Sequence, residues 1–209
     1  MQLRAVRKSS LSPADQDLID QHHCLRSRVF SERLGWSVDV RDGREADEYD
    51  GLDPTYILAA TDDGRVAGCA RLLPATGPTM LARTFPQLLA GSRLMAHSAM
   101  VESSRFCVDT SLQEGRGGGA LHDVTFLLFA GILEWSMANG YREIVTATDL
   151  RFERILKRAG WPMTRLGEPC RIGNTIAVAG VLPADLASFH RVCPASYRSP
   201  TLSASRQAA

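Results

Sequence analysis

Residues 121–138 constrain the fold more than any other segment, because they predict a helix that is apolar on nearly all sides. One helical face carries Leu121, Val124, Leu128, Ile132 and Trp135. The run FLLFAGIL inside the segment leaves almost no polar face opposite, so we expect the helix to be packed between other elements. No apolar run in the chain approaches the roughly 20 residues that span a bilayer, which favours a core helix over a membrane span.

Strand and helix signals on both sides of this segment indicate the fold class. Residues 55–61 and 65–73 are strand-like and are joined by Asp62-Asp63-Gly64, which predicts a hairpin. Ser12 before Pro13 predicts the start of a helix that runs to about residue 32. Further elements are expected as a short strand at 79–81, a short helix from Phe85-Pro86, strands at 100–108 and 143–148, and helices at 151–159 and 183–192. Residues 171–181 form either a strand pair or one long strand. Hairpins followed by strand–helix alternation are typical of an α/β sandwich with a mixed sheet.

Length and composition bound the architecture and the partners. The 209 residues fit one domain, which we place at 1–194, with a Ser/Ala/Arg-rich tail at 195–209 that we expect to be flexible. A net charge of +1 argues against a nucleic-acid partner. The N-terminus lacks the apolar stretch of a signal peptide, and five scattered cysteines without a CxxC motif read as reduced thiols. We therefore expect a cytoplasmic protein that does not contact a membrane.

Charged and aromatic residues in the first 110 positions are the candidates for chemistry. They are Arg26, Phe30, Trp36, Asp47, Asp50, Arg71, Glu102, Ser104 and Arg105. Each has an ordinary structural explanation when it is taken alone: a helix-face contact, a core anchor, a solvated acid or a strand ion pair. The segment 37–54, which carries both aspartates, reads as a long acidic loop, and such a loop in a compact domain is often functional.

The order and spacing of these residues carry more information than any one of them. Arg-x3-Phe-x-Glu-Arg-Leu-x-Trp from Arg26 is followed by Asp-x2-Asp from Asp47, Gly-x2-Arg-Leu from Gly68, Gly-Pro-Thr-Met-Leu from Gly77 and Glu-x-Ser-Arg-Phe from Glu102. This series resembles the acyl-homoserine lactone synthases, the autoinducer synthases of bacterial quorum sensing. The likeness is specific over residues 26–106 and continues more loosely to Trp161.

The resemblance implies a fold and a set of roles. It implies an α/β fold, a three-layer α-β-α sandwich with a mixed, mostly antiparallel sheet that resembles the GNAT acyltransferase fold. It implies that S-adenosyl-L-methionine is a substrate, that no cofactor is used, and that an acyl-carrier protein or acyl-CoA delivers the acyl group. The positions implied to bind adenosylmethionine or to complete its charged cluster are Arg26, Phe30, Trp36, Asp47, Asp50 and Arg71. The catalytic set is implied to be Glu102 as general base, with Ser104 and Arg105.

Those residue types suit that chemistry. Carboxylates suit the sulfonium and ammonium groups of adenosylmethionine, arginines suit its carboxylate, and an aromatic face attracts a cation. An ammonium must lose a proton before it attacks a thioester, so a carboxylate near the amine is needed as a base. Lactone closure expels methylthioadenosine from a sulfonium that is already a good leaving group, so the protein mainly positions the reacting atoms.

The residues that would bind the acyl donor are indicated less clearly by the sequence. Arg151, Arg154 and Arg158, with Lys157 beside them, share one face of the helix predicted at 151–159. They form either a solvated surface or a docking patch for an acidic acyl-carrier protein. The loop at 116–120 (RGGGA) is either a phosphate-binding loop or a surface turn.

Substrate choice and the remaining motifs leave alternatives open. Thr146 falls near a family position that is linked to acyl preference, although Thr148 competes for that position and a β-branched strand residue is an ordinary alternative. We expect no metal, because His22-His23-Cys24 has no second cluster at a suitable spacing. The competing functions are a GNAT-type N-acetyltransferase that uses acetyl-CoA and a non-enzymatic ligand-sensing module.

Overall fold

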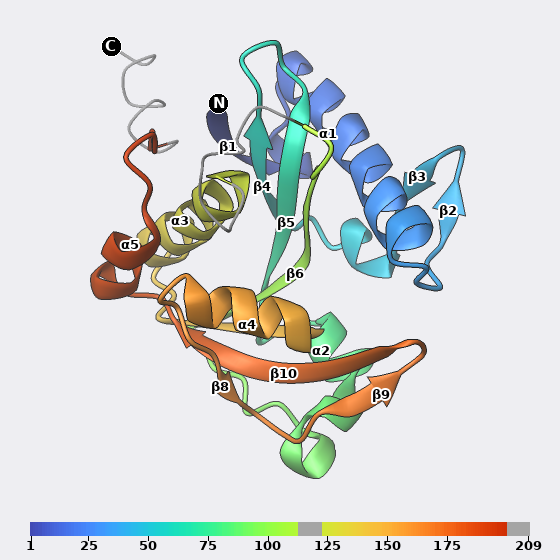
Figure 1. Cartoon of the computed structure of the whole chain (residues 1–209), viewed down its shortest axis with the longest axis vertical. Coiled ribbons are helices and arrows are strands. Elements are labelled where there is room, and N and C mark those ends of the chain that lie inside the picture. Colours follow the sequence, from blue (N-terminus) through green and yellow to red (C-terminus); the bar gives the residue numbers. More distant parts are fainter. Residues whose placement is uncertain (113–122, 200–209) are drawn as a thin grey trace.

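A long mixed sheet organises the computed structural model of the chain, which describes residues 1–112 and 123–199 (Figure 1). Within these ranges the sheet has eight strands in the order β1-β4-β5-β6-β7-β10-β8, with β9 also paired to β10. The strands are β1 (Gln2–Arg7), β4 (Thr55–Ala60), β5 (Val66–Pro74), β6 (Met100–Val108), β7 (Glu143–Asp149), β8 (Thr164–Arg165), β9 (Cys170–Ile172) and β10 (Thr175–Pro183). All pairs are antiparallel except β6–β7, which is parallel. The separate pair β2 (Val40–Arg41) and β3 (Arg44–Glu45) lies beside α1.

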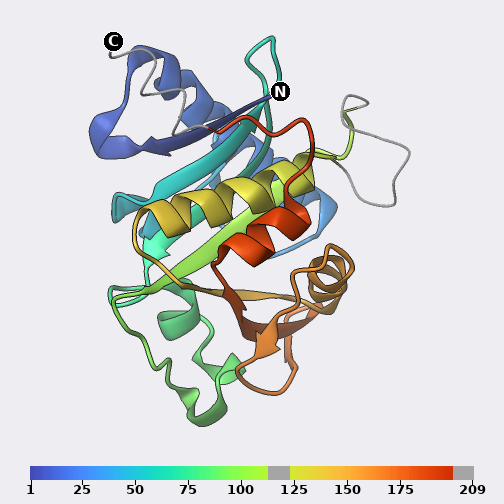
Figure 2. The ribbon, with the colours of Figure 1, turned by 90° about the vertical axis from the view of Figure 1, so that its left-hand side faces the viewer.

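Helices cover both faces of the sheet, as Figures 1 and 2 show. They are α1 (Pro13–Arg26), α2 (Met80–Arg83), α3 (Asp123–Ala138), α4 (Leu150–Arg158) and α5 (Leu186–Val192), and a π-helical segment (Ser27–Arg33) extends α1. Alternation along β4 separates the two layers, because Ile57 packs with α3 and Leu58 packs with α1. The expected three-layer α/β sandwich with a GNAT-like fold is confirmed.

The apolar helix α3 lies against the sheet as its sequence predicts. Val124, Leu128 and Ile132 are all buried, while Leu121 falls outside the described residues. Gly131 lies where α3 crosses β1 and β4, and a Cβ there would collide with Leu3. The glycine costs helix propensity but allows the helix backbone to approach the sheet closely.

The sheet divides between β6 and β7. Only residues Met100–Glu102 of β6 pair with β7, although β6 continues to Val108 and β7 to Asp149. In Figure 1 β5 runs upright whereas β10 crosses the view below it. The sheet therefore consists of an N-terminal half (β1, β4, β5, β6) and a C-terminal half (β7 to β10), joined by a short parallel ladder.

Most predicted elements are confirmed, with instructive exceptions. The strand expected at 79–81 is wrong, because Thr79 caps the N-terminus of α2 through a hydrogen bond to the backbone N–H of Ala82. Residues 37–54 contain β2, β3 and a 3-10 turn rather than only loop. Strands β1 and β8 were not predicted, since β1 is an edge strand with charged outward residues and β8 has two residues.

The segment after α5 is packed where it is described. The Tyr197 hydroxyl donates to Glu134 of α3 at 3.1 Å, and its ring lies against Phe189. Residues 200–209 of the predicted tail lie outside the described residues. None of the helices in the described ranges combines the length and apolar character that crossing a bilayer requires.

Candidate active site

Six charged side chains on the α1 face of the sheet form a closed ring of alternating sign. Its members are Arg26, Glu45, Arg105, Asp47, Arg71 and Asp50. Arg26, the last residue of α1, donates from Nε to Glu45 at 2.5 Å. Its two terminal nitrogens donate to the two oxygens of Asp50, each at 2.8 Å. This bidentate geometry fixes the guanidinium plane as well as its position.

The other half of the ring repeats this arrangement. Arg71 on β5 donates to Asp50 at 2.9 Å and also to Asp47. Arg105 on β6 donates to Asp47 at 2.9 Å and to Glu45 at 3.0 Å, which closes the ring. Each arginine therefore bridges two carboxylates and each carboxylate bridges two arginines, so three positive and three negative charges balance within the site.

Local backbone structure places the two aspartates. Asp47 precedes a 3-10 turn (Glu48–Gly51), and its side chain accepts from the backbone N–H of Tyr49 at 2.9 Å. Asp50 accepts in return from the backbone N–H of Asp47 at 2.8 Å. This reciprocal cap explains the Asp-x2-Asp spacing, because it turns both carboxylates toward the arginines.

A bulge in β6 brings Ser104 and Arg105 to the same site. Between the pairs Cys69–Cys107 and Arg71–Ser104, β6 has one residue more than β5, and Arg105 has a φ of 52°. Strict alternation would point adjacent residues to opposite faces, and the extra residue breaks that rule. The Ser104 hydroxyl accepts from Arg71 Nε at 3.2 Å, while Arg105 reaches the ring.

Burial sets the electrostatics of the ring. Burial alone would raise the pKa of Asp50, but hydrogen bonds from Arg26 and the charges of Arg26 and Arg71 hold that pKa far below its ordinary value. The side chains of Asp47 and Arg105 are 16% and 12% exposed, whereas those of Arg26, Glu45 and Arg71 are 0% exposed. The Asp47–Arg105 edge is therefore the part of the ring most accessible to a ligand.

Two aromatic rings lie beside this edge. Phe30 and Trp36 stack with centroids 5.3 Å apart and planes 3° apart. The Arg105 guanidinium carbon lies 5.5 Å from the Phe30 centroid. The arrangement places a cation-accepting aromatic surface next to a carboxylate and a guanidinium.

Glu102 lies close by in sequence but has other partners. It is 1% exposed, and its two carboxylate oxygens accept from the backbone N–H groups of Met80 at 3.0 Å and Leu81 at 2.6 Å, at the start of α2. Burial raises the pKa of Glu102, and these two hydrogen bonds oppose the rise. The carboxyl group combines the raised proton affinity of a candidate base with an anchoring role for α2.

The residues expected on the acyl side lie elsewhere. Thr146 is half-buried on β7, where alternation with Val145 points it toward the face that carries α3 and α4. Arg151, Arg154, Lys157 and Arg158 are exposed on α4. The glycine-rich loop at 116–120 lies outside the described residues.

Glu45 is a ring member that the motif comparison missed. It is fully buried on β3 and bonds both Arg26 and Arg105. A charge count gave no signal for it, because the candidate set already balanced three arginines with three carboxylates, Asp47, Asp50 and Glu102. Its place in the acidic segment 37–54 was the only hint.

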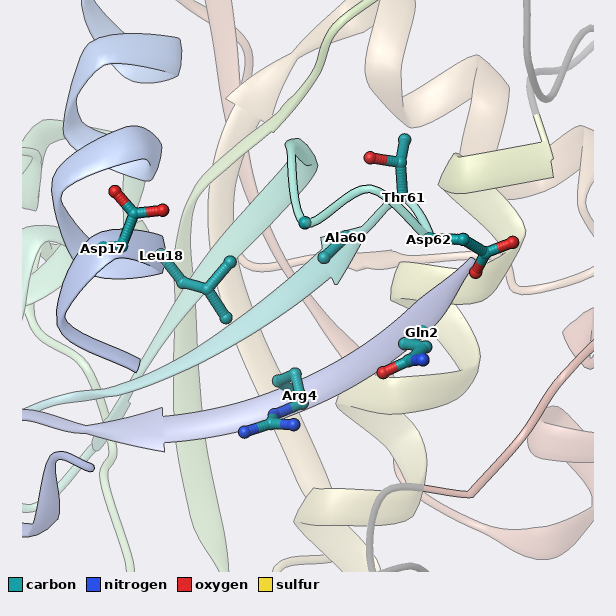
Figure 3. Close-up of a pocket in the computed structure, with 8 residues that line it drawn as sticks. Gln2, Arg4, Asp17, Leu18, Ala60, Thr61 and Asp62 are labelled. Atoms are coloured by element: carbon teal, nitrogen blue, oxygen red, sulfur yellow. The ribbon is translucent and has the colours of Figure 1, made fainter. Parts of the chain in front are cut away.

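Two other features can be separated from the site. A surface hollow between β1, α1 and the β4–β5 turn is lined by residues including Arg4, Asp17, Thr61 and Asp62, and no ring residue lines it (Figure 3). Within residues 1–112 and 123–199, no group of three or more His, Cys, Asp or Glu is arranged to hold a metal ion.

A GNAT-like sheet that divides beside a buried polar site defines an enzyme of the acyltransferase class. The autoinducer synthase family profile matches residues 10–192, so the chain belongs to the autoinducer synthase family. It is 68% identical over 181 residues to an acyl-homoserine-lactone synthase of Rhizobium radiobacter, covering 87% of this chain and 85% of that protein. The assignment is therefore to the acyl-homoserine-lactone synthases rather than to the N-acetyltransferases or the non-enzymatic sensors.

Solved structures agree with this assignment. The AHL synthase LasI superposes with a TM-score of 0.81 at 32% identity, covering 94% of this chain and 98% of that chain. The CoA-dependent acyl-homoserine lactone synthase BjaI, solved with SAM and isopentyl-CoA, superposes with a TM-score of 0.81 at 23% identity, covering 98% of each chain. The second likeness concerns the fold alone.

Proposed function

We propose that this synthase joins the acyl group of a carrier thioester to the amine of S-adenosyl-L-methionine and then closes the homoserine lactone. The binding of adenosylmethionine is supported by the closed charge ring, because its accessible Asp47–Arg105 edge lies next to the Phe30–Trp36 stack. Asp47 suits the substrate's cations, Arg105 suits its carboxylate, and the aromatic pair suits its sulfonium. The buried members, Arg26, Glu45, Asp50 and Arg71, hold that edge in place.

The reaction then proceeds in two balanced steps. Glu102 takes a proton from the substrate ammonium, the amine nitrogen bonds to the thioester carbon, and the carbon–sulfur bond breaks. The nitrogen loses a second proton as the amide forms, so one proton ends on the departing thiolate, the other is released to solvent, and Glu102 returns to its carboxylate form. The substrate's own carboxylate oxygen next attacks its γ-carbon and releases methylthioadenosine, a step for which the protein supplies position.

The role of Glu102 as general base can be tested separately from its role in anchoring α2, because a substitution can remove the base and keep a hydrogen bond to the α2 backbone. Glu102→Gln keeps the size of the side chain and one acceptor for the α2 backbone, and we expect it to retain the fold but lose most amide formation. Glu102→Asp is the matched control, since it keeps a base but shortens its reach. A well-folded Glu102→Gln protein with normal turnover would remove Glu102 from this role.

The acyl donor is proposed from charge and from relatives. BjaI was solved with an acyl-CoA, whereas the exposed arginines of α4 favour an acidic acyl-carrier protein. We expect charge reversal at Arg154 and Arg158 to raise the Michaelis constant for carrier-bound donors and to spare CoA donors. Equal effects on both donors would contradict docking at α4.

One experiment tests the reaction as a whole. Purified protein is mixed with adenosylmethionine and a panel of acyl-carrier-protein and CoA thioesters, and products are identified by mass spectrometry. We expect an N-acyl-homoserine lactone and methylthioadenosine in equal amounts. The absence of any lactone across a broad panel would refute the proposal, while the best donor would identify the acyl chain.

A further inference from the structure

The turn between β9 and β10 lies against the segment that carries Trp36, although about 140 residues separate them in sequence. The Trp36 indole N–H donates to the Thr175 hydroxyl at 3.1 Å. Asn174 donates from its side-chain amide to the carbonyl oxygens of Leu34 at 3.3 Å and Gly35 at 3.4 Å. The contact therefore has both a side-chain and a backbone component.

These hydrogen bonds form one directed chain. The Thr175 hydroxyl accepts from Trp36 and donates to the Asn174 side-chain oxygen at 3.0 Å. With that oxygen occupied, the Asn174 amide nitrogen points toward the carbonyls of residues 34 and 35. Gly35 has a φ of 63°, a conformation that favours glycine.

The contact joins the two halves of the molecule at the substrate side. Trp36 follows the helix of the N-terminal half, and Thr175 begins β10 in the C-terminal half. In Figure 1 the turn between β9 and β10 lies on the same side of the molecule as α1, β2 and β3. The sheet itself joins its halves through three residue pairs of β6 and β7, and apolar residues of both halves pack together in the core. The contact at Trp36 adds a polar link between the halves at the substrate side.

The position of Trp36 depends on this link. Its ring is half-buried and is stacked on Phe30, and Phe30 in turn lies under Arg105. An offset aromatic stack tolerates sliding of one ring over the other, whereas a hydrogen bond at the indole nitrogen fixes the ring in its plane. The hydrogen bond from Trp36 to Thr175 thus restrains the in-plane position of the indole ring, which the stack alone does not.

We propose that Thr175 and Asn174 are positioning residues of the adenosylmethionine site, because they lock Trp36 against Phe30 from the opposite half of the molecule. The inference rests on the proposed role of the Phe30–Trp36 stack in binding that substrate. It assigns to the β9–β10 turn a part in recognising the amine substrate and none in the chemistry.

The test compares three variants of the full chain. Thr175→Val removes the hydroxyl with little change in shape, Thr175→Ser keeps it, and Thr164→Val makes the same change at an exposed threonine of β8. We expect Thr175→Val to raise the dissociation constant for adenosylmethionine about threefold to tenfold, the effect of one lost hydrogen bond. Thr175→Ser and Thr164→Val are expected to bind as the wild type does, in isothermal titration with adenosylmethionine alone.

A spectroscopic measurement separates positioning from general destabilisation. The difference between the wild type and Trp36→Phe identifies the fluorescence of Trp36, and we expect Thr175→Val to shift that component while Thr175→Ser leaves it in place. Asn174→Ala is the second variant, used if Thr175→Val fails to fold, with the same shift expected.

Three outcomes overturn the proposal, and they are distinguishable. Unchanged binding in a folded Thr175→Val or Asn174→Ala protein contradicts the positioning role alone. Weaker binding that Thr175→Ser does not rescue, or weaker binding without a shift in Trp36 fluorescence, indicates a merely structural effect and contradicts it as well. A wild type that binds no adenosylmethionine refutes the proposed function, and the positioning role with it.

Discussion

Replacing Glu45 by Gln tests whether the charge ring holds the fold together. The Glu45 carboxylate is fully buried and contacts Arg26 at 2.5 Å and Arg105 at 3.0 Å, so its loss leaves the ring with three positive and two negative charges. At an effective dielectric constant of about 20, each close pair is worth roughly 4 kcal/mol before desolvation is subtracted. Removing one partner of a buried pair costs about 3–5 kcal/mol net, and we expect a loss of that size in the free energy of unfolding.

Urea denaturation at neutral pH measures this loss. We expect a lower midpoint with an unchanged slope, because the surface exposed on unfolding stays the same. Asp39→Asn is the matched control, since Asp39 pairs with Arg41 on the surface, and an exposed pair of this kind contributes little that can be measured.

A double-mutant cycle gives the stricter result. Glu45→Gln combined with Arg105→Gln restores two charges of each sign, so we expect the double variant to be clearly more stable than the sum of the single losses predicts. A loss below about 1 kcal/mol in Glu45→Gln would refute the reasoning that a balanced, desolvated ring stabilises the site. Simple additivity in the cycle would refute it independently.

Three further predictions follow from burial, close approach and charge. Burial, and then the charges of His23 and Arg26, lower the pKa of His22 well below its ordinary value of 6.5 and outweigh the opposing charge of Asp50. The unfolded chain therefore binds more protons, and stability falls as pH drops below about 6.5. His22→Gln is expected to flatten this fall in thermal melts, whereas His190→Gln, at an exposed histidine, is expected to keep it. Gly131→Val places branched carbon where α3 meets the sheet and is expected to cost at least 1–3 kcal/mol in urea denaturation; an unchanged midpoint would contradict that packing. Tyr56→Phe removes the hydroxyl that donates to Asp50 at 2.7 Å, and we expect the free energy of unfolding to fall by about 1.5–3 kcal/mol. An unchanged free energy of unfolding would indicate that the arginines alone satisfy that carboxylate.

Local patterns determined much of the fold. The all-round apolar character of 121–138 predicted α3 as a buried helix, because such a segment has no face that water can solvate. The Asp62-Asp63-Gly64 turn predicted the β4–β5 hairpin, and Ser12 before Pro13 predicted the start of α1. These features depend on residues a few positions apart, so the sequence alone contains their causes.

The failures can also be explained from particular residues. Thr79 stands in an apolar run that resembles a strand, yet Glu102 from β6 accepts from the backbone N–H groups of Met80 and Leu81 and favours a helix start there. A long-range carboxylate thus overrides the local preference. Edge strand β1 was not predicted because its charged outward residues leave only Leu3 and Val6 buried.

The sequence by itself determined the family and the candidate arginines and aspartates of the site, and it predicted only a long acidic loop where Asp47 and Asp50 form a capped turn. Only the tertiary structure decided how these side chains form a closed ring. Glu45 comes from a two-residue strand beside α1. Arg105 faces the site through a bulge that no alternation pattern predicts. Thr175 meets Trp36 across 139 residues. A ring of charges and a contact between halves arise from elements far apart in the chain, and their positions are fixed only when the sheet and its helices pack together.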